Sequence, residues 1–117
     1  MKITQREVDN AVVLDLSGKL TGGPDAETFR EVFKSLIDQD KKNIIVNLEK
    51  VSWINSTGLG ILISGYTSVR RGGGDLVIMH ASDRIESILY VTKLNLLFKA
   101  YESEEAALAS FAEKSEE

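Results

Sequence analysis

Two short apolar runs separated by a helical pattern do most to limit the folds open to this chain. Residues 43–48 and 75–79 are rich in β-branched and other apolar side chains, as is typical of strands covered on both faces. Between them, from residue 56 to about 71, apolar residues recur at three- and four-residue spacing, which predicts a helix. Alternating strands and helices connect by right-handed crossovers, so we predict an α/β fold with a largely parallel or mixed sheet.

The segments before residue 43 predict a hairpin and a helix. Residues 3–6 and 11–16 read as two strands, with Asp9 and Asn10 as the turn between them. Pro24 suits the first position of a helix because its missing N–H would have no partner there. That helix should run to about Gln39, with its apolar residues on one face.

The C-terminal part predicts two more helices and a last strand. The glycines at 72–74 supply a positive-φ residue that ends the helix before them. Asp83 and Glu86 have capping-box spacing at the start of a third helix. A strand is expected around residues 98–101, followed by a closing helix capped near Ser103. In total we expect about four to five strands packed against about four helices.

Length and composition limit the classes of function. With 117 residues, the chain is predicted to form a single domain over 1–113, with a frayed tail at 114–117. Its net charge of -4 and scattered lysines and arginines disfavour direct nucleic-acid binding. The absence of cysteine and the single histidine exclude a disulfide framework and a zinc centre, and we expect no cofactor. No apolar run is long enough for membrane insertion, so we expect a cytoplasmic protein.

The junction between the strand at 43–48 and the following helix is the candidate functional site. Asn55 and Ser56 are both competent N-caps, so their side chains should lie beside the free N–H groups and the positive end of the helix dipole. A hydroxyl at this place is well positioned to carry a phosphate. From the residues alone, the favoured interpretation is that Asn55 and Ser56 only cap the helix.

Enzymatic readings of the same turn have little support. Ser56 as the nucleophile of a small hydrolase would need a base, and His80 follows a core strand, where a strand-end role is more typical. Gly58 and Gly60 lack the third glycine of a dinucleotide-binding loop. Trp53 is expected to support the turn from a buried or half-buried position, with an interface anchor as the alternative.

Residues 43–72, and above all the segment 47–60 with its Asn55-Ser56-Thr57-Gly58 turn, resemble the signature of bacterial anti-sigma factor antagonists, the single-domain members of the STAS family. Gly18, the pair Gly73-Gly74 and the segment 94–98 extend the resemblance over nearly the whole chain. The resemblance implies a STAS-like fold.

The resemblance also implies a function. In that family the serine after the motif aspartate is phosphorylated by a partner that is both anti-sigma factor and serine kinase, and the matching residue here is Ser56. The unphosphorylated antagonist binds the kinase and so releases a sigma factor, and a serine phosphatase restores the bound state. The chain would then be a kinase substrate and binding protein and not an enzyme. The alternative within the fold is a subunit of another partner-switching or lipid-transport complex that does not act on a sigma factor.

One position departs from the family motif. The family aspartate is Asn55 here, which keeps the size and the capping ability but loses the negative charge. If the charge orients the serine or contacts the kinase, phosphorylation of Ser56 would be impaired. If the aspartate only caps the helix, little would change.

The partner-binding surface can be placed on the second helix. Its small and polar residues fall on the side away from the apolar stripe and would let another backbone approach closely. The residues predicted to touch the kinase are Asn55, Ser56, Thr57, Gly58, Gly60, Ser64 and Thr67.

Overall fold

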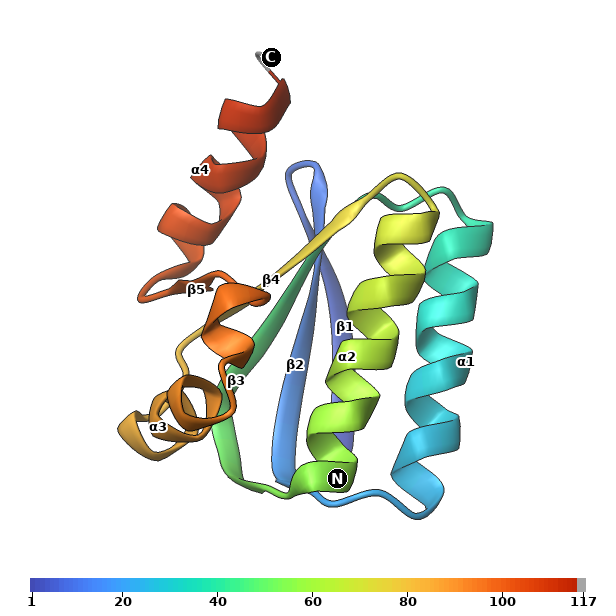
Figure 1. Cartoon of the computed structure of the whole chain (residues 1–117). Helices are drawn as coiled ribbons and strands as arrows, with labels where there is room; N and C mark the ends of the chain where they lie inside the picture. The colour runs from blue at the N-terminus through green and yellow to red at the C-terminus, as the bar shows by residue number, and fades with distance from the viewer. Residues whose placement is uncertain (116–117) are drawn as a thin grey trace.

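The chain forms one five-stranded mixed sheet with the strand order β1-β2-β3-β4-β5 (Figure 1). The computed structural model describes residues 1–115, and their side chains as far as Ala112. The strands are β1 (Lys2–Val8), β2 (Ala11–Leu20), β3 (Asn43–Ile54), β4 (Asp75–Met79) and β5 (Ala100–Tyr101). Only β1 and β2 pair in antiparallel fashion, and all other neighbours are parallel. The predicted hairpin and mixed sheet are therefore confirmed.

Four α-helices connect or follow these strands, as the sequence predicts. They are α1 (Pro24–Asp38), α2 (Ser56–Arg71), α3 (Asp83–Val91) and α4 (Glu104–Ser115), and a short 3₁₀ helix, η1 (Leu94–Leu96), precedes β5. Pro24 is at the first position of α1, and Gly73, just beyond α2, adopts a φ of 86°. The tail predicted at 114–117 is described only in part, because α4 includes residues up to Ser115 and the last two residues lie outside the described range.

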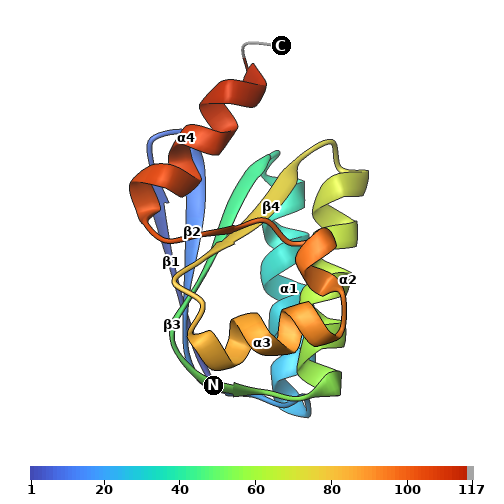
Figure 2. The same ribbon diagram turned by 60° about the vertical axis from the view of Figure 1, so that its left-hand side comes forward.

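The two faces of the sheet are covered unequally. Helices α1, α2 and α3 pack on one face and, with the inward side chains of β2, β3 and β4, form the main hydrophobic core. On the other face, α4 is the one helix among residues 1–115, and it lies across one end of the sheet in Figure 2. Ala107 and Phe111 of α4 are buried there against Val13, Ile45 and Met79.

Two strand ends differ from those expected. β2 and β3 extend to Leu20 and Ile54 instead of ending near residues 16 and 48. In the second half of β3, burial recurs every third residue, at Val51 and Ile54. The pairing register of β2 and β3 shifts twice here, so β3 carries extra residues as in a β-bulge. A search for alternation at period two misses such a strand.

Two local predictions were wrong. The capping box of Asp83 and Glu86 does not form, because Ser82 is the N-cap of α3 and its hydroxyl accepts the N–H of Ile85 at 3.3 Å. The last strand is shorter than the predicted 98–101, because Phe98 is buried in the core and only two residues pair with β4.

Candidate functional site

The β3–α2 turn lies at the carboxyl ends of the parallel strands β2 and β3, beside the loop that joins β2 to α1. In parallel α/β sheets, this edge is where loops from neighbouring strands meet and where ligands bind. The backbone N–H of Asn55 donates to the carbonyl of Leu20 at 3.3 Å, so the two loops are joined directly.

Asn55 is the N-cap of α2 and uses both ends of its amide. Its side-chain oxygen accepts the backbone N–H of Gly58 at 2.8 Å, which satisfies one of the free donors of the first turn. Its side-chain nitrogen donates to the carbonyl of Thr21, in the β2–α1 loop, at 3.2 Å. The asparagine therefore caps the helix and also holds the neighbouring loop, which an ionised aspartate could not do by donation.

Glycine lets the two loops approach each other at van der Waals distance. A Cβ atom on Gly58 would lie 2.0 Å from the carbonyl oxygen of Leu20. Gly22 is buried with a φ of 101°, and a Cβ there would lie 2.5 Å from Cγ2 of Thr57. The position of the turn is thus fixed by main-chain packing against the β2–α1 loop.

Ser56, the first residue of α2, is exposed, as is Thr57. The first turn of α2 contains no acidic residue. The hydroxyl of Ser56 therefore lies in water at the positive end of a 16-residue helix without a carboxylate on that turn. This environment accepts added negative charge.

The remaining residues predicted for partner binding follow α2 away from the turn. Gly60, Ser64 and Thr67 are all exposed, whereas Gly58 is buried against Leu20. The structure thus brings Asn55, Ser56 and Thr57 together at one end of α2 and places Gly60, Ser64 and Thr67 along its outer side. The predicted apolar stripe faces the core, with Leu59, Leu62 and Val69 buried.

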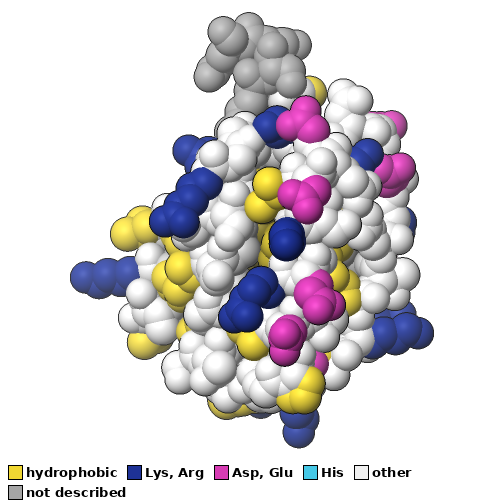
Figure 3. Space-filling model, turned by 90° about the vertical axis from the view of Figure 1, so that its right-hand side faces the viewer, with side chains coloured by type: hydrophobic (Ala, Val, Ile, Leu, Met, Phe, Trp, Pro, Cys, Tyr) yellow, Lys and Arg dark blue, Asp and Glu magenta, His cyan; other side chains and the backbone are white. Residues whose placement is uncertain are grey.

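Thr57, Gly60 and Ser64 also line a groove between α1 and α2, which we call the α1–α2 groove. It has a volume of about 460 Å³. Figure 3 views the molecule from the side of α1, where hydrophobic side chains appear between acidic and basic groups. The residues that line the groove are Ala26, Phe29, Arg30, Phe33, Lys34, Ile37, Thr57, Gly60, Ile61, Ser64, Gly65 and Ser68.

Sequence reasoning missed the contributions of the β2–α1 loop and of α1 to this region. Thr21 holds the amide of Asn55, and Arg30 and Lys34 line the α1–α2 groove. A signal for the loop is present, because the glycine pair before Pro24 follows a strand that is parallel to β3. No sequence signal places Arg30 and Lys34 at a groove, because cations that line a groove and cations that are simply solvated on a helix have the same sequence pattern.

Trp53 was expected to be buried or half-buried, and this was wrong. Its side chain is 42% exposed, and the guanidinium of Arg84 in α3 lies 5.9 Å from the centre of its ring. Trp53 lies in the bulged part of β3, at the second register shift, where Ser52 beside it is also exposed. The indole is therefore a surface feature two residues before the cap of α2.

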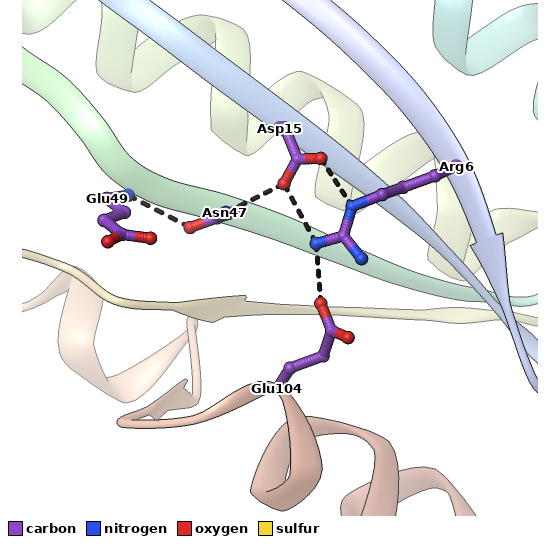
Figure 4. Close-up of polar contacts among 5 residues, drawn as sticks. All are labelled: Arg6, Asp15, Asn47, Glu49 and Glu104. Atoms are coloured by element: carbon purple, nitrogen blue, oxygen red, sulfur yellow. Dashed lines mark hydrogen bonds and ion pairs between the residues drawn. The ribbon is translucent and has the colours of Figure 1, made fainter.

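A polar cluster on the other face of the sheet has a structural role (Figure 4). Arg6 donates from Nε to Asp15 at 2.6 Å and from a terminal nitrogen to Glu104 of α4, also at 2.6 Å. Asn47 donates to Asp15 at 2.8 Å. The hydrogen bonds from Arg6 and Asn47 hold the pKa of Asp15 below its usual value, and the two carboxylates raise the pKa of Arg6. The cluster joins β1, β2, β3 and α4.

The base considered for Ser56 as a nucleophile is His80. Within the described part of the chain, no hydrogen bond joins Ser56 to His80. The backbone N–H of His80 instead donates to the carbonyl of Tyr101 at the β4–β5 edge, where His80 has a φ of 57°.

Among residues 1–115, no helix is both long enough and apolar enough to cross a membrane.

Comparisons with known proteins identify related sequences and structures. Residues 2–107 match the model of the STAS domain. An anti-sigma-B factor antagonist of Staphylococcus aureus is 33% identical over 75 residues, which cover 64% of this chain and 69% of the relative.

Solved structures show the same fold. The unphosphorylated form of the anti-sigma factor antagonist SpoIIAA superposes with a TM-score of 0.71 at 18% identity, covering 96% of this chain and 98% of SpoIIAA. A sulfate transporter family protein from Wolinella succinogenes superposes with a TM-score of 0.79 at 21% identity, covering 92% of this chain and 89% of that one. The chain belongs to the STAS domain family, and its homologues over most of its length are named anti-sigma factor antagonists.

Proposed function

We propose that this protein is a phosphorylation-switched binding module that antagonises an anti-sigma factor with serine-kinase activity. The observation that carries the proposal is the exposed hydroxyl of Ser56 at the first position of α2, on a turn fixed by main-chain packing. Unphosphorylated, the module binds the kinase and so releases a sigma factor. Phosphorylation of Ser56 ends the binding, and a serine phosphatase restores it. The names of the relatives support this choice, and SpoIIAA has also been solved in a phosphorylated form.

The switch requires no large conformational change. A phosphate on Ser56 interacts favourably with the N–H groups and dipole of α2, so the domain stays folded. The phosphate instead weakens the complex with the kinase. It adds about -1.5 to -2 charges, and a like charge or an unpaired desolvated group in an interface costs several kcal/mol of binding free energy. Since about 1.4 kcal/mol is tenfold in affinity, one phosphate changes binding by orders of magnitude.

Asn55 is compatible with this proposal. The capping work of the family aspartate is done here by the amide oxygen, at 2.8 Å from the N–H of Gly58. The lost negative charge lowers the repulsion that a phosphate on the next residue would meet. Asn55 therefore favours retention of the phosphate, and any contact that the kinase makes to a family carboxylate has to be made to an amide.

Affinity capture tests the proposal. Wild-type protein, Ser56→Asp and Ser87→Asp serve as baits in lysate of the native host cells, and bound proteins are identified by mass spectrometry. Ser87 is exposed on α3, so its variant adds the same charge away from the turn. The wild type and Ser87→Asp should recover a serine-kinase-type anti-sigma factor, and Ser56→Asp should lose it.

A kinase assay completes the test. Purified kinase with ATP should phosphorylate the wild type at Ser56, and the product should no longer bind the kinase. Equal recovery of the kinase by the wild type and Ser56→Asp, or phosphate at another residue only, would contradict the proposal.

A second candidate is a STAS subunit of another partner-switching or lipid-transport complex. The superposition on a sulfate transporter family protein favours it, because the same fold occurs in a membrane-transport family. Capture of transport subunits with equal yield by the wild type and Ser56→Asp would establish this candidate in place of the first.

A further inference from the structure

The α1–α2 groove has an apolar floor and a cationic rim. Beneath it lie Phe29 and Phe33 of α1, which are buried in the core, and Ile61 of α2, which is half-buried. Arg30 and Lys34 are the charged residues among those that line it, and both are exposed. Neither forms an ion pair within the described part of the chain. The groove thus presents two exposed cations, with Glu27, Glu31 and Asp38 of the same helix within one turn of them.

The spacing of these cations defines what they can bind. Arg30 and Lys34 are four residues apart on α1, so they lie about 6 Å apart along the helix axis. A second helix has the same spacing between residues four apart on one of its faces. A partner helix with two carboxylates one turn apart therefore matches both cations at once.

No contact inside the protein requires a glycine at position 60. A Cβ at Gly60 would meet no atom within 4 Å. A glycine inside a helix is less stable than alanine, and here no internal contact explains it. Gly65, by contrast, is required by packing, because its Cβ would lie 2.4 Å from Cε2 of Phe33.

We propose that the α1–α2 groove binds an amphipathic helix of the partner protein, with an apolar face on the groove floor and two carboxylates one turn apart on Arg30 and Lys34. The assignment of this partner as the anti-sigma kinase rests on the proposed function. Helix-in-groove recognition needs an apolar groove several turns long. The α2 side runs from Thr57 to Ser68, about 16 Å at the rise of an α-helix, which is room for about three turns.

A helix fits this groove better than a small molecule does. Gly60 and Ser64, on the α2 wall, are exposed to solvent. A small ligand in such a trough would stay partly in water, whereas ligand pockets bury about 70–90% of the surface of their ligand. A helix laid along the trough from outside would cover the small residues of α2 and the apolar floor together.

The groove also explains why phosphorylation of Ser56 would weaken binding and not strengthen it. Thr57 lines one end of the groove, and Ser56 precedes it. A phosphate on Ser56 would therefore add negative charge at the end of a site that holds an acidic helix. Repulsion between the phosphate and the partner's carboxylates would weaken binding.

Photo-crosslinking in the native host cells tests the groove. A small diazirine amino acid replaces Ser64 in the groove or, as a positional control, Lys99 beside β5, and the crosslinked peptides are sequenced. Position 64, and not 99, should crosslink a protein segment with helical apolar periodicity and carboxylates three or four residues apart.

Charge and volume variants then probe the contacts. With the probe at position 64, Arg30→Glu/Lys34→Glu should lower the yield about tenfold or more. Lys93→Glu/Lys99→Glu makes the same charge change outside the groove and should keep the yield. Gly60→Leu fills the groove and should also lower the yield, and circular dichroism confirms that each variant is folded.

The outcomes separate this inference from the proposed function. No product specific to position 64, a crosslinked segment without carboxylates, or an unchanged yield with Arg30→Glu/Lys34→Glu would overturn the groove assignment. Adding Ser56→Asp to the position-64 probe reports on the switch. If the acidic helix still crosslinks with Ser56→Asp, the groove assignment stands and the proposed function fails.

Discussion

At the scale of single residues, Asn55 carries two structural tasks in one side chain. Its oxygen caps α2 through the N–H of Gly58, and its nitrogen binds the carbonyl of Thr21. The sequence predicts the first task, because asparagine is a preferred N-cap at the start of an apolar helical pattern. The second task depends on where the β2–α1 loop lies, which no local pattern gives.

Replacing Asn55 by alanine should lower the free energy of unfolding by about 0.5–2 kcal/mol, the usual cost of losing an N-cap. The measurement is urea denaturation followed by circular dichroism. Asn95→Ala, at an exposed amide in η1, is the control and should change the free energy of unfolding by less than about 0.5 kcal/mol. Similar losses in both variants would show that the cap of α2 contributes no special stability.

An acidic residue should have opposite effects at the two ends of α2. Ser56→Asp adds negative charge at the positive end of the dipole and should keep or raise the free energy of unfolding by about 0.3–1 kcal/mol. Arg71→Asp replaces a cation of the last turn and should lower it. Thermal denaturation at low salt compares the two variants. A destabilised Ser56→Asp would mean that phosphate at this position strains the turn.

At the scale of secondary-structure elements, two glycines in α2 look alike in the sequence but differ in their surroundings. Gly60 faces open space, and Gly65 lies against the ring of Phe33. Gly65 lets α1 and α2 approach closely beside the sheet.

The same substitution at these two glycines should therefore change stability in opposite directions. Gly60→Ala should raise the free energy of unfolding by about 0.5–1 kcal/mol, because alanine has the higher helix propensity. Gly65→Ala should lower it by about 1–3 kcal/mol, because the added methyl overpacks the contact with Phe33. Chemical denaturation of the matched pair checks both signs. A higher free energy of unfolding for Gly65→Ala would mean that α1 moves away from α2 without loss of stability.

Element types and order were predictable because local signals agreed with the fold. Pro24 and the glycines after α2 delimited two helices, and the apolar run in β3 identified a central strand. The bulged half of β3 was missed because burial there follows a period of three. The exposed position of Trp53 was missed because a tryptophan near a core strand is ordinarily buried, whereas the bulge turns this residue outward.

At the scale of the whole molecule, contacts between residues distant in sequence hold together the face of the sheet that carries α4. Arg6, Asp15 and Glu104 come from β1, β2 and α4. Solvated charges on strands and helix starts give no sequence signal for such a cluster. The cations of the α1–α2 groove were unpredictable for the same reason, because their role depends on how α1 packs beside α2.

This cluster should make stability depend on acid pH. The hydrogen bond from Arg6 lowers the pKa of Asp15 in the folded state. The contribution of Asp15 is therefore fully present above its unfolded pKa, about 3.9, and is lost as the pH falls through the lower folded pKa. Asp15→Asn should reduce the loss of stability on acidification.

Urea denaturation between about pH 7 and pH 2 measures this dependence. Asp38→Asn, at an exposed carboxylate of α1 without an ion pair among the side chains of residues 1–112, is the control. It should leave the acid dependence close to that of the wild type. An equal change in both variants would show that Asp15 has no special part in acid unfolding.

The contact between Gly58 and the carbonyl of Leu20 has a consequence for engineering. Main-chain atoms set the place of the turn, so Ser56 can be exchanged for other modifiable residues without moving it. The charges of the groove stand on a different helix, α1, and can be changed separately. Under the proposed function, the modified residue on α2 and the partner preference set by α1 could be varied independently of each other.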